Sequence, residues 1–358
     1  MITSPATMRR FAALLAAILL FPIVPGIASA QEFTEVFDRD RCTFATTGSN
    51  PYFPLWPGYS LVLEGEEEEE GETVEVSAVL TVTADTELVD GVLTRVFEER
   101  ESEDGELVEV SRNFVAYCRE TGDVWYFGED VDDYEDGEIV SSEGEWRAGV
   151  DGATPGILMP GNPLLGARYF QEVAPGVALD RGEVLSRDEV LEVPVGLFED
   201  VLLIEDTDAL DPGKADPKYY APGVGNIKDE DLELVEVVPP PCQPTDTTLC
   251  LANGRFRVSA AWRDFEGEEG AGRSQLPTDD SGSFWFFSPE NTELLVKVLD
   301  ACDLPEFNSF WVFVGGLTNV EVVLTVTDTQ TAETRVYENE LGQPFEPILD
   351  TAAFDTCP

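Results

Sequence analysis

Short segments in which apolar and polar residues alternate, separated by turn signals, run through almost the whole chain. In residues 73–83 every second position is apolar: Val74, Val76, Ala78, Leu80 and Val82. This is the pattern of a strand with one buried face. Asp-Gly pairs at 90–91, 104–105 and 136–137 suit two-residue hairpin turns, because glycine tolerates the positive φ that such turns need. The pattern predicts an all-β fold built largely from consecutive antiparallel hairpins.

A proline-rich stretch divides the chain into two parts. Residues 238–245 (VPPPCQPT) are typical of a stiff linker. Residues 31–237 would then form an antiparallel β domain, a meander long enough that it must curl into a half-barrel or barrel-like sheet or split into packed sheets. We expect an apolar concave face in this domain. Residues 246–358 contain roughly six or seven short alternating segments and fit a C-terminal immunoglobulin-like β-sandwich domain.

The first thirty residues (1–30) have the pattern of a secretory signal peptide. Arg9 and Arg10 precede an apolar stretch at 11–24, and the small residues 28–30 (ASA) form a cleavage signal before Gln31. The apolar stretch has 14 residues, whereas a spanning helix needs about 20. No second stretch of spanning length follows. We therefore expect an exported protein without a transmembrane segment in the mature chain, located in the periplasm or outside the cell.

All six cysteines lie after the expected cleavage site. An even number of cysteines in an exported chain predicts disulfide bonds, although six cysteines allow about 15 pairings. If each domain is self-contained, the first two cysteines pair with each other and the last four pair among themselves. We expect the pairs Cys42–Cys118, Cys242–Cys250 and Cys302–Cys357, the last of which would hold the C-terminus in place.

The charge and composition of the chain exclude several kinds of catalytic site, metal site and partner. There are 72 acidic residues against 21 lysines and arginines, a net charge of −51, and no histidine. Serine–histidine–aspartate and cysteine–histidine nucleophile systems are therefore excluded, as are metal sites with histidine ligands. A nucleic-acid partner is not expected either, because phosphate contacts need clustered lysines and arginines.

Such an acidic surface has two interpretations. Like charges repel one another at low salt, and about 1 M salt screens that repulsion because the Debye length falls to ~3 Å. We therefore favour an acidic, halophilic protein adapted to a saline medium, with calcium binding as the alternative. The run of five glutamates at 66–70 is expected to form a solvated loop, since closely spaced like charges extend the chain.

Two acidic stretches are candidate calcium sites, and calcium is the only cofactor that the sequence suggests. In the first, Tyr134 stands where a ligand is needed and the flanks look like strands, so an acidic hairpin turn is favoured. In the second, Asp-Pro-Gly favours a turn. The candidate ligands are Asp132, Asp136 and Glu143 in the first stretch, and Asp206, Asp208 and Asp211 in the second.

Aromatic residues and paired carboxylates are further candidate site residues. Trp125, Tyr126 and Phe127 are candidate ligand contacts, but consecutive residues of a strand face opposite sides, so at least one should lie in the core. Paired carboxylates could hydrolyse glycosidic bonds. With 72 acidic residues, pairs at a suitable spacing arise by chance, so no catalytic residue is assigned.

Several stretches resemble known exported proteins. Residues 50–58 (NPYFPLWPG), 122–129 (GDVWYFGE) and 219–225 (YYAPGVG) resemble, in this order, a family of uncharacterised exported bacterial proteins. The last also resembles the end of periplasmic half-barrels of the lipoprotein-carrier type. The C-terminal domain resembles a β-sandwich accessory module of secreted bacterial proteins, and the stretches that carry this likeness are 249–258, 282–287, 293–300, 310–320 and 325–329. The resemblance implies a place outside the cell and no particular activity.

The sequence favours an exported, non-catalytic binding or interaction protein whose partner is a protein, a glycan or a lipid. One alternative is a carrier that shelters a lipid or other apolar ligand in the N-terminal domain, and another is a carboxylate-based polysaccharide hydrolase. An apolar cavity would favour the carrier. A groove with two acids and exposed tryptophan would favour the hydrolase, and a filled core would leave the interaction protein.

Salt adaptation predicts a melting temperature that rises by more than about 5 °C between low and molar NaCl, because screening removes the repulsion among carboxylates. Differential scanning calorimetry of the mature protein measures this. A melting temperature that does not change with NaCl would contradict salt adaptation. The same rise produced by millimolar CaCl₂ at low ionic strength would favour calcium binding instead.

Overall fold

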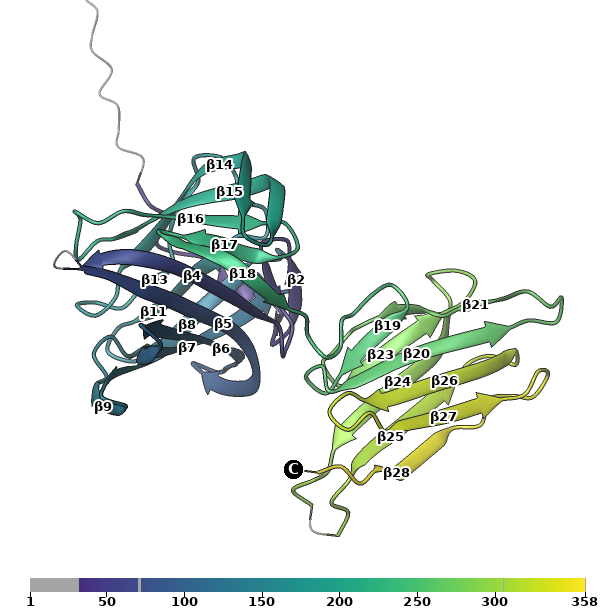
Figure 1. Ribbon diagram of the computed structural model, residues 1–358. Coiled ribbons are helices and arrows are strands. Elements are labelled where there is room, and N and C mark those ends of the chain that lie inside the picture. The colour runs from purple at the N-terminus through teal and green to yellow at the C-terminus, as the bar shows by residue number, and fades with distance from the viewer. Residues whose placement is uncertain (1–31, 70–71, 305, 358) are drawn as a thin grey trace, which may run out of the picture. The chain divides into compact units, whose positions relative to one another are not determined.

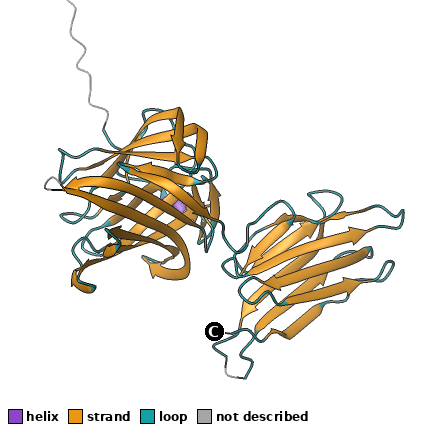
Figure 2. Cartoon of the chain, in the orientation of Figure 1, coloured by secondary structure: helices purple, strands orange, loops and turns teal. Residues whose placement is uncertain are grey.

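The computed structural model describes residues 32–69, 72–304 and 306–357, and the expected signal peptide lies outside them. Strands predominate in these residues, and the only helical element among them is the 3-10 turn η1 (Arg39–Arg41) (Figure 2). The expected all-β class is therefore confirmed. None of the helical structure in the described ranges is long and apolar enough to cross a membrane.

The N-terminal region, residues 32–238, contains eighteen of the strands described. They are β1 (Phe44–Ala45), β2 (Gly48–Asn50), β3 (Phe53–Leu55), β4 (Ser60–Glu69), β5 (Glu72–Val89), β6 (Val92–Glu103), β7 (Glu106–Cys118), β8 (Val124–Glu135), β9 (Glu138–Ser141), β10 (Trp146–Arg147), β11 (Thr154–Met159), β12 (Arg168–Phe170), β13 (Glu172–Val173), β14 (Asp180–Val193), β15 (Gly196–Asp208), β16 (Asp216–Ala221), β17 (Gly225–Asp229) and β18 (Leu232–Val238).

Most of these strands form one antiparallel sheet that nearly closes on itself (Figure 1). Its order is β12-β14-β15-β16-β17-β18-β4-β5-β6-β7-β8-β11-β13. The meander from β14 to β18 and the meander from β4 to β8 meet where β18 pairs with β4, with Leu234 opposite Leu63. The expected meander has thus curled into its barrel-like form rather than splitting into packed sheets.

Residues 168–173 bring the two ends of the sheet together. Within this stretch β12 pairs with β14, and β13 pairs with β11 at the opposite end of the strand order. Between them, the amide of Gln171 donates a hydrogen bond to the carbonyl of Asp180 at 2.8 Å. One short piece of chain therefore bonds to both ends, and the sheet encloses an interior.

The run of glutamates expected to form a loop is part of a strand as far as Glu69, so that expectation was wrong. β4 continues to Glu69 and stays paired with β5, with Glu67 opposite Val74. The backbone hydrogen bonds of the hairpin hold these residues extended. The side chains of residues 66–68 remain exposed, so their charges are solvated without breaking the strand.

The C-terminal region, residues 246–357, is a β-sandwich of two five-stranded sheets with a core of its own. One sheet has the order β19-β20-β26-β27 with β21 on β20, and the other has the order β22-β23-β24-β25-β28. The strands are β19 (Thr248–Leu251), β20 (Phe256–Arg263), β21 (Glu269–Ala271), β22 (Arg273–Gln275), β23 (Ser281–Trp285), β24 (Thr292–Asp300), β25 (Phe310–Gly316), β26 (Glu321–Asp328), β27 (Thr334–Asn339) and β28 (Ile348–Phe354).

The disulfide bonds follow the expected pairing, and none of the described cysteines is free. The first bond ties the segment before β1 to the end of β7, and the last ties the chain near its C-terminus to the loop after β24. The three pairs are Cys42–Cys118, Cys242–Cys250 and Cys302–Cys357.

A buried ion pair secures the end of the sandwich. Asp328 has a fully buried side chain, and its carboxylate lies 2.9 Å from the guanidinium of Arg255. The hydroxyl of Thr356 donates to the same carboxylate oxygen at 2.6 Å. Burial alone would raise the pKa of Asp328, but the hydrogen bonds from Arg255 and Thr356 outweigh it and hold that pKa below its usual value.

Replacing Asp328 with alanine is expected to destabilise the protein by about 3–5 kcal/mol, because it leaves the largely buried charge of Arg255 without a carboxylate partner. Urea unfolding followed by tryptophan fluorescence measures the change. The control is Glu321→Ala, which breaks the exposed pair with Arg263 and should cost only about 0–1 kcal/mol. Equal effects of the two substitutions would contradict the assignment.

Candidate functional site

The nearly closed sheet of the N-terminal region encloses a cavity of about 210 Å³. This is smaller than the ~300–1,000 Å³ of sites for drug-sized ligands. The expected apolar concave face is not what lines it. Polar and apolar side chains share the wall, and five carboxylic acids face a single lysine: Glu99, Glu129, Asp180, Asp206, Asp229 and Lys218.

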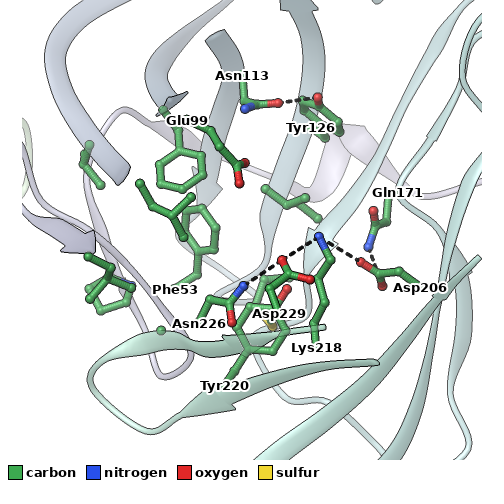
Figure 3. A pocket seen from close by; sticks show the side chains of 18 of the residues that line it. Phe53, Glu99, Asn113, Tyr126, Gln171, Asp206, Lys218, Tyr220, Asn226 and Asp229 are labelled. Carbon is green, nitrogen blue, oxygen red and sulfur yellow. Dashed lines mark hydrogen bonds and ion pairs between the residues drawn. The ribbon is translucent and has the colours of Figure 1, made fainter. Parts of the chain in front are cut away.

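Lys218 lies at the centre of a chain of polar contacts (Figure 3). Its Nζ is 3.0 Å from a carboxylate oxygen of Asp229 and 4.0 Å from one of Asp206. The side-chain amide of Gln171 donates to Asp206 at 3.0 Å, and that of Asn226 donates to Asp229 at 3.1 Å. The lysine and these two aspartates are therefore satisfied by groups of the protein itself.

The electrostatics of this network keep the lysine charged. Burial lowers the pKa of Lys218, but the carboxylates of Asp229 and Asp206 outweigh it and hold the pKa well above its usual value. Burial raises the pKa of Asp206 to about 6, while Lys218 and Gln171 oppose that rise.

Glu99 is different, because nothing in the described residues pairs with it. Its side chain projects from β6 into the cavity, and no hydrogen bond or ion pair joins it to another group (Figure 3). Burial raises the pKa of Glu99 to about 8, although the positive charge of Lys218 acts to lower it. At neutral pH the unpaired carboxyl group therefore holds a proton for much of the time.

Two further carboxyl groups also lack a cation. Burial raises the pKa of Glu129 to about 7, although the hydroxyl groups of Ser111 and Tyr126 lower it. Burial likewise raises the pKa of Asp180, whose backbone amide donates to the fully buried Glu172 at 2.7 Å. One lysine cannot compensate this many acids, so part of the cavity wall keeps its charge low by binding protons.

Two β-bulges aim side chains into the cavity. In β8, Glu129 lies opposite Asn113 and Tyr126 lies opposite Val115, so one extra residue is inserted between them. Residues three apart on a regular strand face opposite sides, but the bulge lets both Tyr126 and Glu129 line the cavity. The same device in β17 gives Asn226 and Asp229 a common direction.

The segments 50–58, 122–129 and 219–225 all reach this cavity. Phe53, Tyr126 and Tyr220, one from each segment, line its wall. The side-chain amide of Asn50 donates to the carbonyl of Gly122 at 2.8 Å. The amide of residue 223 donates to the carbonyl of residue 51 at 2.6 Å. Stretches far apart in the sequence thus assemble one wall.

The three consecutive aromatic residues of β8 divide as strand alternation requires. Tyr126 lines the cavity, and its hydroxyl donates to the side-chain carbonyl of Asn113. Trp125 and Phe127 are buried on the other face, where both rings pack edge-on against Phe44 at centroid distances of 5.5 and 5.3 Å. Only Tyr126 can therefore contact a ligand in the cavity.

The first candidate calcium stretch is an acidic hairpin. β8 and β9 are joined by Asp136 and Gly137, whose φ angles of 52° and 77° are those of a tight hairpin turn. Asp132 is paired with Arg112 at 2.8 Å, whereas Asp136 and Glu143 are exposed. Among the described residues, no three acidic or cysteine side chains are grouped closely enough to hold a metal ion.

The second candidate stretch does not form one cluster. Asp206 lies at the cavity with Lys218. Asp208 accepts a hydrogen bond from the amide of Leu210 at 2.7 Å, and Asp211 is exposed in the following turn. Of these three candidate ligands, only Asp206 therefore lines the cavity.

Most of the polar wall was missed from the sequence. Glutamates occupy both parities of β6, at Glu98, Glu99 and Glu101, so alternation could not show which one points inward. A usable signal was the scarcity of lysine: the chain has only four, and Lys218 directly precedes the 219–225 segment.

The raised pKa of Glu99 predicts a stability that falls as the pH rises. A folded-state pKa above the unfolded value means that the native state binds more protons, so stability is lost between about pH 5 and pH 9. Each group that must release its proton contributes up to about 1.4 kcal/mol per pH unit. Urea unfolding in 1 M NaCl, where surface charges are screened, should show this slope.

The variant Glu99→Gln should flatten the pH dependence of stability and stabilise the protein above pH 8, because the amide needs no proton to be neutral. The matched control is Glu103→Gln, an exposed position on the same strand, which should leave the slope unchanged. An equal slope in the wild type and Glu99→Gln would contradict the assignment.

Known proteins do not indicate what this cavity holds. No protein-family model, no curated protein and no solved structure matches the chain. Its function is inferred here from the shape and chemistry of the cavity itself.

Proposed function

We propose that this chain is a non-catalytic binding protein that holds one small polar ligand in the cavity of its N-terminal region. The observation that carries the proposal is a cavity of about 210 Å³ whose wall includes a half-buried carboxyl group, Glu99, without a partner among the described residues. An unpaired carboxyl group that faces a cavity is free to accept hydrogen bonds from a ligand there.

The chemistry of the wall disfavours an apolar ligand. A lipid chain in this cavity would leave Glu99 against hydrocarbon with no hydrogen-bond partner among the described residues, and burying a polar group without hydrogen bonds is costly. The volume is also small for a lipid. A carrier of this form would therefore transport a small polar molecule.

One observation favours catalysis. The pKa values of Glu99 and Glu129, raised to about 8 and about 7, suit a general acid near neutral pH. A polysaccharide hydrolase, however, needs a groove that admits a polymer, and this cavity has room only for a small molecule. Binding is therefore the better supported function.

The proposed setting is outside the cytoplasm. Three disulfide bonds suit a chain that folds in an oxidising compartment, and the acidic composition suits a saline medium. In this proposal the C-terminal sandwich serves as an accessory module for contact with a further partner.

The test combines ligand detection with a variant that fills the cavity. Native mass spectrometry of the mature protein, isolated without detergent from its own exported fraction, should show a small extra mass that is lost on activation. Leu80→Trp places a larger side chain in the cavity wall and should remove that mass. Leu88→Trp, on the exposed part of the same strand, should retain it.

A panel of small organic cations, anions and neutral polyols, measured by ligand-observed NMR, covers ligands lost during isolation. Binding of any member that Leu80→Trp weakens at least tenfold supports the proposal. A bare wild-type mass together with no such binding from the whole panel would overturn it.

A further inference from the structure

The cavity wall has an excess of acids that the protein does not compensate. Five carboxylic acids line it against one lysine. The ammonium group of Lys218 is already engaged by Asp229 at 3.0 Å and Asp206 at 4.0 Å. It is therefore not free to bind an anionic ligand, and an anion would repel the remaining acids whenever they ionise.

The unpaired acid lies beside aromatic rings. Phe97 and Glu99 are two residues apart on β6 and both line the cavity. The ring of Phe97 packs edge-on against that of Phe53, with 4.9 Å between ring centroids, and Tyr59 and Tyr220 also line the wall. A carboxylate that accepts hydrogen bonds next to aromatic faces is the combination that binds an organic ammonium group.

A metal ion fits this wall less well. Calcium takes about six to eight oxygen ligands at 2.3–2.6 Å, and no three acidic side chains of the described ranges are grouped closely enough to hold a metal ion. The carboxyl groups are instead distributed around the cavity on β6, β8, β14, β15 and β17. Such spacing suits hydrogen-bond donors spread over a small organic molecule.

We infer that the ligand is a small organic cation with a primary ammonium group, which donates hydrogen bonds to Glu99 inside the cavity. This inference rests on the proposed binding function and names the class of ligand. Lys218 fixes the opposite side of the site by holding Asp206 and Asp229 in place.

The test uses four-carbon compounds that differ in their charged group. Butylammonium, butanol and butyrate are titrated into the mature protein by calorimetry in 1 M NaCl, which screens the acidic surface. Butylammonium should bind at least tenfold more tightly than butanol or butyrate. Tetramethylammonium and CaCl₂ are titrated under the same conditions as competing kinds of cation.

Two variants assign the binding to the proposed acid. Glu99→Gln keeps the size of the side chain but removes its charge, and should weaken butylammonium binding at least tenfold. Glu103→Gln, exposed on the same strand, should leave binding unchanged. Because the ammonium group displaces protons from raised-pKa carboxyl groups, binding at pH 7.5 should also release protons. Titrations in two buffers of different ionisation enthalpy measure this release, which Glu99→Gln should reduce.

The outcomes separate the ligand class from the binding function. Tighter binding of butanol or butyrate, weakened by Leu80→Trp, would overturn the cation inference and leave the proposed function intact. Tighter binding of tetramethylammonium or calcium would overturn the inference that the ligand carries a primary ammonium group. Unchanged butylammonium affinity in Glu99→Gln would overturn the inference that Glu99 binds that group. No binding of any compound, with a bare native mass, would overturn both proposals.

Discussion

The large sheet depends on a single short stretch, residues 168–173, that pairs with strands at both of its ends. An open sheet of this length would leave two edges with unpaired backbone groups and an exposed inner face. Joining β14 to β11 through one continuous stretch of chain nearly closes the sheet, which reduces both costs and creates the interior. The cavity, the inward direction of Glu99 and the burial of Lys218 all follow from this closure.

Closure also sets the chemistry of the interior. A carboxyl group that is solvated on an open sheet becomes buried when the sheet closes, and it then needs a cation, hydrogen-bond donors or a proton. Asp206 and Asp229 have Lys218 and two side-chain amides. Glu99 has neither a cation nor a hydrogen-bond donor bonded to it among the described residues, and its raised pKa favours the protonated form. The wall is thus divided between a part that the protein stabilises and a part that a ligand could stabilise.

Sequence patterns were sufficient for the class of fold and for the three disulfide bonds. The alternation along residues 73–83 and the Asp-Gly turns depend only on neighbouring residues, so they can be recognised in the sequence. The cavity could not be predicted in this way. Its wall is assembled from eleven strands, and bulges in β8 and β17 reverse the direction that alternation assigns to Glu129 and Asp229. Neither closure of the sheet nor a β-bulge can be recognised in a sequence with so many acidic residues.

The bulges separate the length of a strand from the direction of its side chains. Removing one residue between Tyr126 and Glu129 would restore a regular ladder, and because these residues would then be two apart, both side chains would still point into the cavity. The flanking strand pairs could stay as they are. A single-residue deletion at the bulge could therefore preserve both the fold and the cavity wall, so relatives with the same specificity could differ in strand length at this position.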